Sequence, residues 1–342
     1  TGRLKSLVAM DPHEKNIMTG VMAIRKLMDE IKTCLLNVSG DIKTEIEKIG
    51  EPLADADFDH FLKLPVSKKW SYEEMAEQDV LLRFRKREKI RSCLHAIYHL
   101  DALISVGKVA LENHYCFPVA TPPERKTVSF TKIFHPMVKS AVSNSLTIDP
   151  SGNIVFLTGA NMAGKSTFMK SLGIAMYLAH IGFPVAAAAM TFSVKEGIYT
   201  SINLPDNLGK GISHFYAEVL RVKKVAAELV MNKQLFIIID ELFRGTNVKD
   251  AYEATVALTA AFARKSNCMF IVSTHIMEAG EALQQQCKNI QYVFLPTRMR
   301  GNVPEYTYRL EKGITADRHG MIIVENEGIL ELLSQKNKSE LP

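Results

Sequence analysis

Residues 159–166 have the spacing of a loop that binds phosphate. Gly159, Gly164, Lys165 and Ser166 fit the pattern G-x-x-x-x-G-K-[ST], between an apolar run and a predicted helix. Glycines let backbone N–H groups surround phosphate oxygens, and the helix N-terminus adds partial positive charge. We expect Lys165 to reach the β- and γ-phosphates of ATP and Ser166 to bind Mg²⁺. The predicted nucleotide-binding residues are Gly159, Ala160, Asn161, Met162, Ala163, Gly164, Lys165, Ser166 and Thr167.

Two acids and a histidine follow two further apolar runs. Asp240 and Glu241 end the run that starts at Phe236, and His275 follows the run 269–274. Polar residues at the carboxyl ends of buried strands face the crevice where α/β sheets bind ligands. We expect Asp240 to hold Mg²⁺ through water and Glu241 to polarise the attacking water as general base. His275 would orient that water or sense which nucleotide, ATP or ADP, is bound.

Ser213 predicts a second anion site. It stands at the N-cap of a predicted helix over residues 213–231, and a serine-capped helix N-terminus attracts anions. This helix is not the one that follows the phosphate loop. We therefore expect a second copy of the chain to complete each site, with Ser213 of one subunit touching the γ-phosphate bound by the other. The predicted catalytic residues are Glu241, His275, Lys165 and Ser213.

The first 120 residues are predicted to form an all-α domain. An amphipathic helix opens at Pro12, and Ser71 with Glu74 three residues later has the spacing of a capping box. The helix that begins there is expected to reach about Glu112. Its basic residues over 83–91 have two interpretations, a solvated helix face or a contact with DNA phosphates.

Residues 126–336 are predicted to form an α/β domain, after a proline-rich linker at 116–125. Apolar strands alternate with helices, which is typical of a mostly parallel sheet buried on both faces. The expected elements are strand 154–158, helix 165–181, strands within 192–203, helix 213–231, strand 235–240, helix 248–264, strand 269–274, helix 276–286, and strands near 290–295 and 305–310.

Composition restricts the partners and the cellular compartment that are expected for this chain. Its 342 residues carry 42 Lys and Arg against 37 Asp and Glu, a mild excess that permits nucleic-acid contact without arguing for it. Five widely spaced cysteines fit a reducing cytosol and no structural zinc. Residues 171–194 lack Asp, Glu, Lys and Arg, yet Gly182 and Pro184 favour a buried helix followed by a strand over a membrane span. Because the chain opens at Thr1 and not at a methionine, we expect a fragment or a processed form. No basic-then-apolar signal peptide pattern opens it, so we expect a cytoplasmic location.

The ordered set of motifs resembles the MutS family of DNA mismatch-repair ATPases. The matching stretches are 159–167, 206–218, 240–246 and 273–275, with Phe134-His135-Pro136 before them and the stretch from Tyr308 to Gly313 after them. The resemblance implies an ABC-type P-loop ATPase domain behind a helical lever. It also implies ATP or ADP with Mg²⁺, a homodimer, double-stranded DNA that is mismatched or branched, and downstream repair proteins as partners.

The chain departs from this family at several positions. Ala160 and Ala163 replace a proline and a glycine in the loop, and Leu242-Phe243 replaces Ile-Gly after the acids. Ala141 stands where the family has an aromatic residue for adenine, and Arg318-His319 stands where Ser-Tyr is usual. The mismatch-reading domain of the family has no counterpart here, so the motifs leave DNA specificity open.

Three alternatives share the same residues. A MutS paralogue that acts on recombination intermediates or branched DNA would carry the same ATPase. A transporter or chromosome-cohesion ATPase has the same class of ATPase domain, although Asn161-Met162 and Arg244-Gly245-Thr246 fit the MutS family better. A dimerisation module switched by nucleotide would bind ATP without releasing phosphate.

Overall fold

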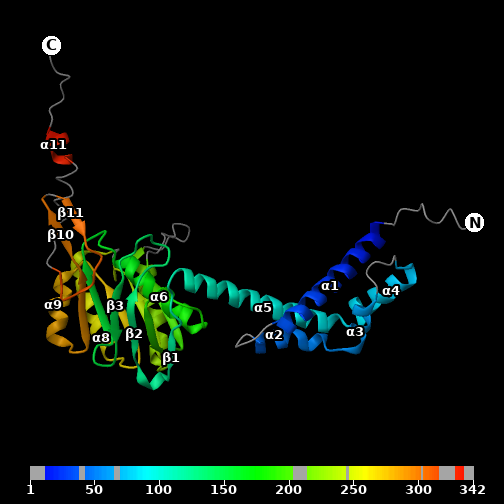
Figure 1. The fold of residues 1–342 in the computed structure, drawn as a ribbon. Helices are drawn as coiled ribbons and strands as arrows, with labels where there is room; N and C mark the ends of the chain where they lie inside the picture. The colour runs from blue at the N-terminus through cyan, green and yellow to red at the C-terminus, as the bar shows by residue number, and fades with distance from the viewer. Residues whose placement is uncertain are drawn as a thin grey trace, which may run out of the picture. The chain divides into compact units, whose positions relative to one another are not determined.

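The chain divides into two compact units, Thr1–Lys108 and Val109–Pro342. A computed structural model describes residues 12–37, 43–64, 70–202, 214–243, 246–301, 303–315 and 328–334. The two units are described separately below, with the element labels of Figure 1. Ser213, Arg244, Gly245 and the stretch 316–327 lie outside the described residues, so the sequence predictions that concern them remain predictions.

The described elements of the first unit are all helical. The core is formed by apolar side chains from several helices, with Phe58 and Phe61 fully buried beside Val21, Met28 and Leu82. The amphipathic helix predicted to open at Pro12 is confirmed. The elements in order are α1 Pro12–Asn37, α2 Lys43–Gly50, η1 Glu51–Leu53, α3 Ala56–Lys63, α4 Tyr72–Val80, the π turn η2 Leu81–Arg85, and α5 Arg87–Glu112.

The helix expected from Ser71 to Glu112 is interrupted. The capping box is present, with Ser71 Oγ accepting from the Glu74 amide and Glu74 Oε2 accepting from the Ser71 amide. However, α4 passes into the π turn η2, which ends at Arg85 with Lys86 as its C-cap, before α5 begins at Arg87. A π turn accommodates an extra residue. Here Leu82 lies in the core while the Lys86 ammonium, 2.8 Å from Asp55 Oδ2, is held to another helix.

Part of the basic stretch 83–91 is neutralised within the unit. Lys86 and Lys89 both donate to Asp55, and hydrogen bonds from these ammonium groups hold the pKa of that carboxyl well below its usual range. Arg83 pairs with Asp79 on the preceding turn. These pairs support the solvated-face interpretation for Arg83, Lys86 and Lys89. They do not bear on the remaining basic residues of 83–91.

A six-stranded sheet organises the second unit. Its order is β12-β9-β4-β8-β7-β6, and every pair is parallel except β12 with β9. The prediction of a mostly parallel sheet is therefore confirmed. The strands are β4 Ile154–Gly159, β6 Gly197–Ser201, β7 Leu235–Ile239, β8 Met269–Ser273, β9 Ile290–Leu295 and β12 Glu311–Lys312.

Each face of this sheet has its own hydrophobic core. Helix α6 and a second sheet cover one face, where Leu172 and Met176 pack with Val155 and Ile271. Helices α7, α8 and α9 cover the other face. Neighbouring residues of each central strand point to opposite faces, which explains their unbroken apolar runs. The helices are α6 Lys165–His180, α7 His214–Val230, α8 Val248–Ala263 and α9 Met277–Gln286, and a short helix, α11 Ile329–Ser334, lies near the carboxyl end.

The second sheet was not predicted. Its order is β1-β5-β2-β3, and β2 pairs antiparallel with both neighbours. The expected linker at 116–125 is partly wrong, because Val119–Thr121 pairs with β5 and Pro123–Arg125 forms a 3-10 turn, η3. Three prolines excluded a helix but left an edge strand possible. The strands are β1 Val119–Thr121, β2 Val128–Ile133, β3 Asn144–Ile148 and β5 Ala189–Ser193.

The strand expected at 305–310 is also shorter than predicted. A hairpin, β10 Thr297–Arg300 with β11 Val303–Tyr306, ends at Tyr306. Tyr308 then adopts a left-handed backbone conformation with φ +54°, which extended strands exclude. Asn144 donates from Nδ2 to the Tyr308 carbonyl and accepts at Oδ1 from the Leu310 amide. A side chain therefore makes the backbone hydrogen bonds that a neighbouring strand would otherwise make.

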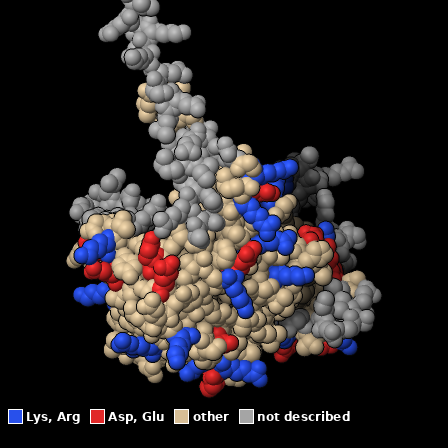
Figure 2. Space-filling model, turned by 90° about the vertical axis from the view of Figure 1, so that its left-hand side faces the viewer, with Lys and Arg blue, Asp and Glu red and all other residues tan. Residues whose placement is uncertain are grey.

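The uncharged stretch 171–194 forms the buried helix and strand that were predicted. Helix α6 ends at His180, Gly182 turns the chain with φ +79°, and β5 follows. Among the described helices only α5 is long and apolar enough to cross a membrane, and 6% of its most apolar window is buried. On the face drawn in Figure 2, Lys and Arg are interspersed with Asp and Glu, so that face carries no broad patch of one charge.

Candidate functional site

The glycine-rich loop, residues 159–164, joins the central strand β4 to α6. Gly159 has φ +147°, and a Cβ there would lie 3.1 Å from the Leu295 carbonyl oxygen. Gly164 caps α6 in a left-handed conformation with φ +98°. Both positions favour glycine, because other residues rarely adopt these angles. A side chain would also crowd β9 at Gly159 and the Tyr308 ring at Gly164. The replacements Ala160 and Ala163 stand between these two glycines, where Ala163 is buried with its methyl group.

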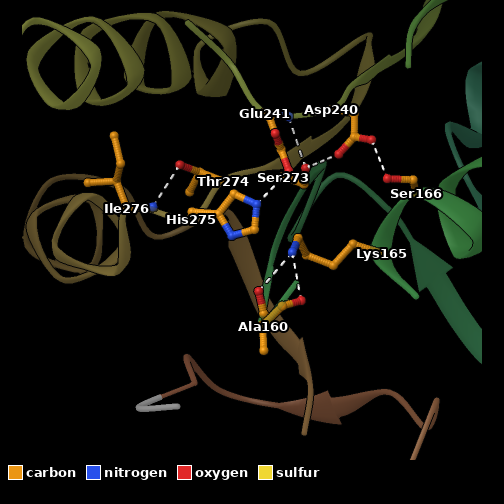
Figure 3. A network of polar contacts seen from close by, with 10 residues as sticks. Ala160, Lys165, Ser166, Asp240, Glu241, Ser273, Thr274, His275 and Ile276 are labelled. Atoms are coloured by element: carbon orange, nitrogen blue, oxygen red, sulfur yellow. Dashed lines mark hydrogen bonds and ion pairs between the residues drawn. The ribbon is translucent and has the colours of Figure 1, made fainter. Parts of the chain in front are cut away.

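Lys165 begins α6 with a buried side chain that returns to the loop. Its ammonium donates to the carbonyl oxygens of Gly159, at 2.8 Å, and Ala160, at 3.1 Å (Figure 3). Burial lowers the pKa of Lys165, while the charges of Glu241 and Asp240 act in the opposite direction. Within the described residues, the hydrogen-bond acceptors of this buried cation are two neutral carbonyls, and such a cation can exchange them for an anion.

The loop helix is tied to the neighbouring strands through Asp240. The Ser166 hydroxyl donates to Asp240 Oδ2 at 2.6 Å, and the Ser273 hydroxyl donates to Asp240 Oδ1 at 2.5 Å. Ser273 also accepts from the Glu241 amide at 3.0 Å. Three elements, α6, the end of β7 and the end of β8, therefore meet at one carboxylate (Figure 3).

Glu241 and His275 form a pair beside this carboxylate. His275 Nε2 lies 2.5 Å from Glu241 Oε1, and both side chains keep part of their surface open to solvent. Glu241 has φ +54°, a left-handed conformation that is unusual for a glutamate. Such conformations cluster at functional sites, where surrounding contacts hold them. Phe243 repeats the feature with φ +62°, at the position where the resemblance implied a glycine.

The structure brings together most of the residues that the sequence singled out. Lys165, Ser166, Asp240, Glu241 and His275 converge at the carboxyl ends of β4, β7 and β8, which are neighbours in the sheet. Asn161, Met162 and Thr167 are exposed around the loop. Ser213 lies outside the described residues, so its place in the site is untested.

Ser273 is a site residue that the sequence reasoning did not assign a role. It is fully buried at the last position of β8 and joins the two acids through its single hydroxyl. The available signal was its position, directly before Thr274-His275 and at the end of an apolar run. A buried serine in that place must find partners, and strand pairing determines that they are the acids after β7.

The donor set suits a nucleotide phosphate beside Mg²⁺. Mg²⁺ prefers hard oxygen ligands and is commonly bound through one or two carboxylates together with substrate phosphates. Ser166 and Asp240 offer such oxygens 2.6 Å apart, and Lys165 supplies the cation that a phosphate requires. Within the described part of the chain no cluster of three or more His, Cys, Asp or Glu forms a separate metal site.

The fold and the site define an α/β protein whose glycine-rich loop and paired acids are arranged to hold an anion next to a cation. The family model MutS domain V matches residues 155–340, more than half of the chain. The chain therefore belongs to the MutS family. The DNA mismatch repair protein MutS of Prochlorococcus marinus (strain MIT 9301) is 27% identical over 266 residues, 75% of this chain and 29% of that protein.

A second relative gives the same result. The DNA mismatch repair protein MutS of Clostridium kluyveri (strain ATCC 8527) is 29% identical over 252 residues, which are 71% of this chain and 28% of that protein. The chain spans less than a third of the length of either relative. Activities and partners of the whole proteins are consequently treated below as proposals.

Proposed function

We propose that this chain is the ATP-binding and ATP-hydrolysing part of a MutS-type DNA mismatch-repair protein, with an ABC-type P-loop domain over residues 126–336 and a helical lever over residues 1–120. The observation that carries the proposal is the meeting of Lys165, the Ser166–Asp240 pair and the Glu241–His275 pair at the ends of neighbouring strands. Each group has a role in phosphoryl transfer to water.

Binding of the triphosphate follows from the loop. Backbone amides of residues 159–167 and the α6 N-terminus would surround the phosphates. Lys165 would exchange its bonds to the Gly159 and Ala160 carbonyls for phosphate oxygens. Ser166 and Asp240 would hold Mg²⁺, which neutralises charge that develops on the phosphates. Ser273 keeps the Asp240 carboxylate in place during this exchange.

Hydrolysis would depend on the Glu241–His275 pair. Glu241 would accept a proton from the attacking water as general base, and His275 would orient the carboxylate through Nε2. This role for His275 refines the predicted one, in which the imidazole orients the water itself. Positioning and charge stabilisation supply most of the rate in such reactions.

Dimerisation and DNA contact belong to the same proposal. Ser213 of one subunit would complete the site of the other, so that a homodimer couples its nucleotide state to clamping of mismatched DNA. The names of the matched relatives support mismatch repair as the process. Downstream repair proteins would respond to the ATP-bound clamp.

The proposal is tested by separating binding from turnover. In the full chain, Lys165→Ala should abolish ATP binding in calorimetry, whereas Lys170→Ala, at an exposed position of the same helix, should not. Glu241→Gln should keep ATP binding and lower phosphate release about 100-fold or more, with exposed Glu253→Gln as control. Saturable binding without phosphate release by the unmodified chain would instead support the nucleotide-switched module.

The DNA partner requires its own experiment. ATP turnover is measured against protein concentration with mismatched, branched and perfectly paired duplexes. Stimulation by the mismatched duplex supports mismatch repair, and stimulation by the branched duplex alone supports the paralogue alternative. Turnover that is independent of protein concentration would argue against composite sites.

A further inference from the structure

The turn that carries Glu241 contains two residues in the left-handed backbone conformation. Glu241 has φ +54° and Phe243 has φ +62°. Residues other than glycine adopt such angles at a cost, so surrounding contacts must hold the turn. At position 243 the resemblance to the MutS family implied a glycine, which would avoid this cost. The phenylalanine found there must therefore gain a compensating contact through its ring.

The ring of Phe243 packs against the first turn of α7. Phe243 is 5% exposed, and its ring centroid lies 5.5 Å from that of Phe215, with the two planes inclined at 58°. Aromatic pairs prefer centroid distances in this range and avoid a face-to-face arrangement. Phe215 is the second residue of α7, and Leu242 is buried in the same hydrophobic core. The two residues that follow Glu241 therefore anchor its turn in the core that α7 covers.

Hydrogen bonds hold the other end of the turn. The Asp240 amide donates to the Ser201 carbonyl at 2.8 Å, and the Glu241 amide donates to the Ser273 hydroxyl at 3.0 Å. These bonds restrain the backbone up to Glu241. Beyond it, the buried side chains of Leu242 and Phe243 provide the restraint.

A cavity beside the turn leaves room for it to move. The cavity has a volume of about 290 Å³, and residues of α7, β6, β7 and the turn itself line it. Its lining includes Glu218 and Val222 of α7 together with Glu241, Leu242 and Phe243. Atoms that face a cavity lack packing partners on that side. The contact between the two rings consequently carries more of the restraint on the turn than it would in a close-packed core.

We propose that Phe215 and Phe243 are positioning residues for Glu241, and that their contact makes the general base depend on the position of the first turn of α7. This inference rests on the proposed function, in which Glu241 accepts a proton from the attacking water. While the rings are in contact, the turn keeps the Glu241 carboxylate beside His275. When the contact is lost, the turn relaxes toward the cavity and the carboxylate leaves the place from which it can act.

The ring contact should affect ATP turnover and leave ATP affinity unchanged. Lys165 and Ser166, which are proposed to bind the phosphates and Mg²⁺, belong to α6 on the opposite face of the sheet. In the full chain, Phe215→Leu keeps apolar bulk and removes the ring. We expect kcat for phosphate release to fall about tenfold, with an unchanged Kd for ATP in calorimetry with Mg²⁺. Phe243→Gly should lose as much turnover, whereas Phe215→Tyr keeps the ring and should retain it.

Combination with Glu241→Gln tests the route by which the rings act. Phe215→Leu should lower kcat in the unmodified background and should have no further effect in the Glu241→Gln background, because the residues act as a unit. The matched control is Phe262→Leu. It breaks a stacked pair with Phe270, whose ring centroid is 4.7 Å away, in the same core but at the opposite end of β8 from Ser273. This control should lower the unfolding midpoint and leave kcat unchanged.

Three results would overturn the inference and leave the proposed function intact. They are undiminished kcat in Phe215→Leu and Phe243→Gly, an equal loss of kcat in Phe262→Leu, and a fully multiplicative loss with Glu241→Gln. If Phe215→Leu does not fold, Phe243→Gly takes its place in each comparison, because glycine relieves the left-handed strain. An unmodified chain that releases no phosphate, or Glu241→Gln with full turnover, would overturn the proposed function and this inference with it.

Discussion

The imidazole of His275 and the carboxylate of Glu241 are hydrogen-bonded, with 2.5 Å between Nε2 and Oε1. Glu241 follows β7 and His275 follows β8, two parallel neighbours in which Ile239 pairs with Val272. A second bond, from the Glu241 amide to the Ser273 hydroxyl, joins the same two strand ends. The proposed general base and the histidine proposed to orient it are thus held together by the ends of two neighbouring strands.

A double-mutant cycle tests this pair. We expect His275→Ala to lower ATP turnover about 10- to 100-fold, because the carboxylate loses the group that orients it. Combined with Glu241→Gln, it should cost little more than Glu241→Gln alone, because residues that act as a unit are not additive. Steady-state phosphate release measures all three variants, with exposed His99→Ala as control. Fully multiplicative losses would show that the residues act independently.

Removal of the Ser273 hydroxyl should affect the use of Mg²⁺. Ser273→Ala deletes one of two hydroxyl bonds that hold Asp240, and it leaves the Glu241 amide without its acceptor. We expect several-fold more Mg²⁺ to be needed for half-maximal turnover, together with a loss of roughly 1–2 kcal/mol in the free energy of unfolding. Mg²⁺ titration of turnover separates this effect from simple destabilisation. Ser129→Ala, which removes an exposed hydroxyl pair in the other sheet, should leave the Mg²⁺ requirement unchanged.

Mixing two inactive variants tests whether Ser213 acts in trans. Each mixed dimer of Ser213→Ala with Lys165→Ala would hold one intact site and one doubly impaired site. Since random pairing makes half of the dimers mixed, we expect about a quarter of the unmodified turnover from an equimolar mixture. Phosphate release at a concentration that favours dimers measures it. Activity equal to the sum of the separate variants would contradict composite sites.

A buried lysine far from the loop predicts a pH-dependent stability. Lys195 is 5% exposed, and its Nζ has no hydrogen-bond partner among the described residues. Burial lowers its pKa from 10.5 to about 8. Below pH 8 the lysine is charged in both the folded and unfolded states, so the folded state carries the whole desolvation cost. Between pH 8 and 10.5 the folded state releases its proton first, and stability rises with pH.

The variant Lys195→Met should therefore stabilise the chain at pH 7, by at most about 3 kcal/mol. The advantage should shrink as the pH rises from 8 toward 10.5. Thermal or urea unfolding at pH 7 and pH 9.5 measures the difference, and exposed Lys223→Met should show no such trend. A Lys195→Met chain that is less stable than the unmodified chain at pH 7 would contradict the prediction.

The sequence alone determined the local features of this protein. Three features could be predicted because each depends on residue type and short spacing. They are the loop pattern around Lys165, the acids after one apolar run and the histidine after another. The parallel sheet was predictable for the same reason, since strands buried on both faces need uninterrupted apolar residues. The capping box at Ser71 is equally local.

Tertiary structure determined the contacts between residues that lie far apart in the sequence. The order β4-β8-β7 places Ser273 between Asp240 and Glu241, and Asn144 holds Tyr308 across 164 residues of chain. The strands β1, β2 and β3 were not predicted, because short edge strands and antiparallel strands gain their stability from partners that are distant in the sequence. The π turn before α5 is likewise followed by a long-range contact, from Lys86 to Asp55 at the N-cap of α3. Such partners are chosen by packing and strand order, which act only once the chain has folded.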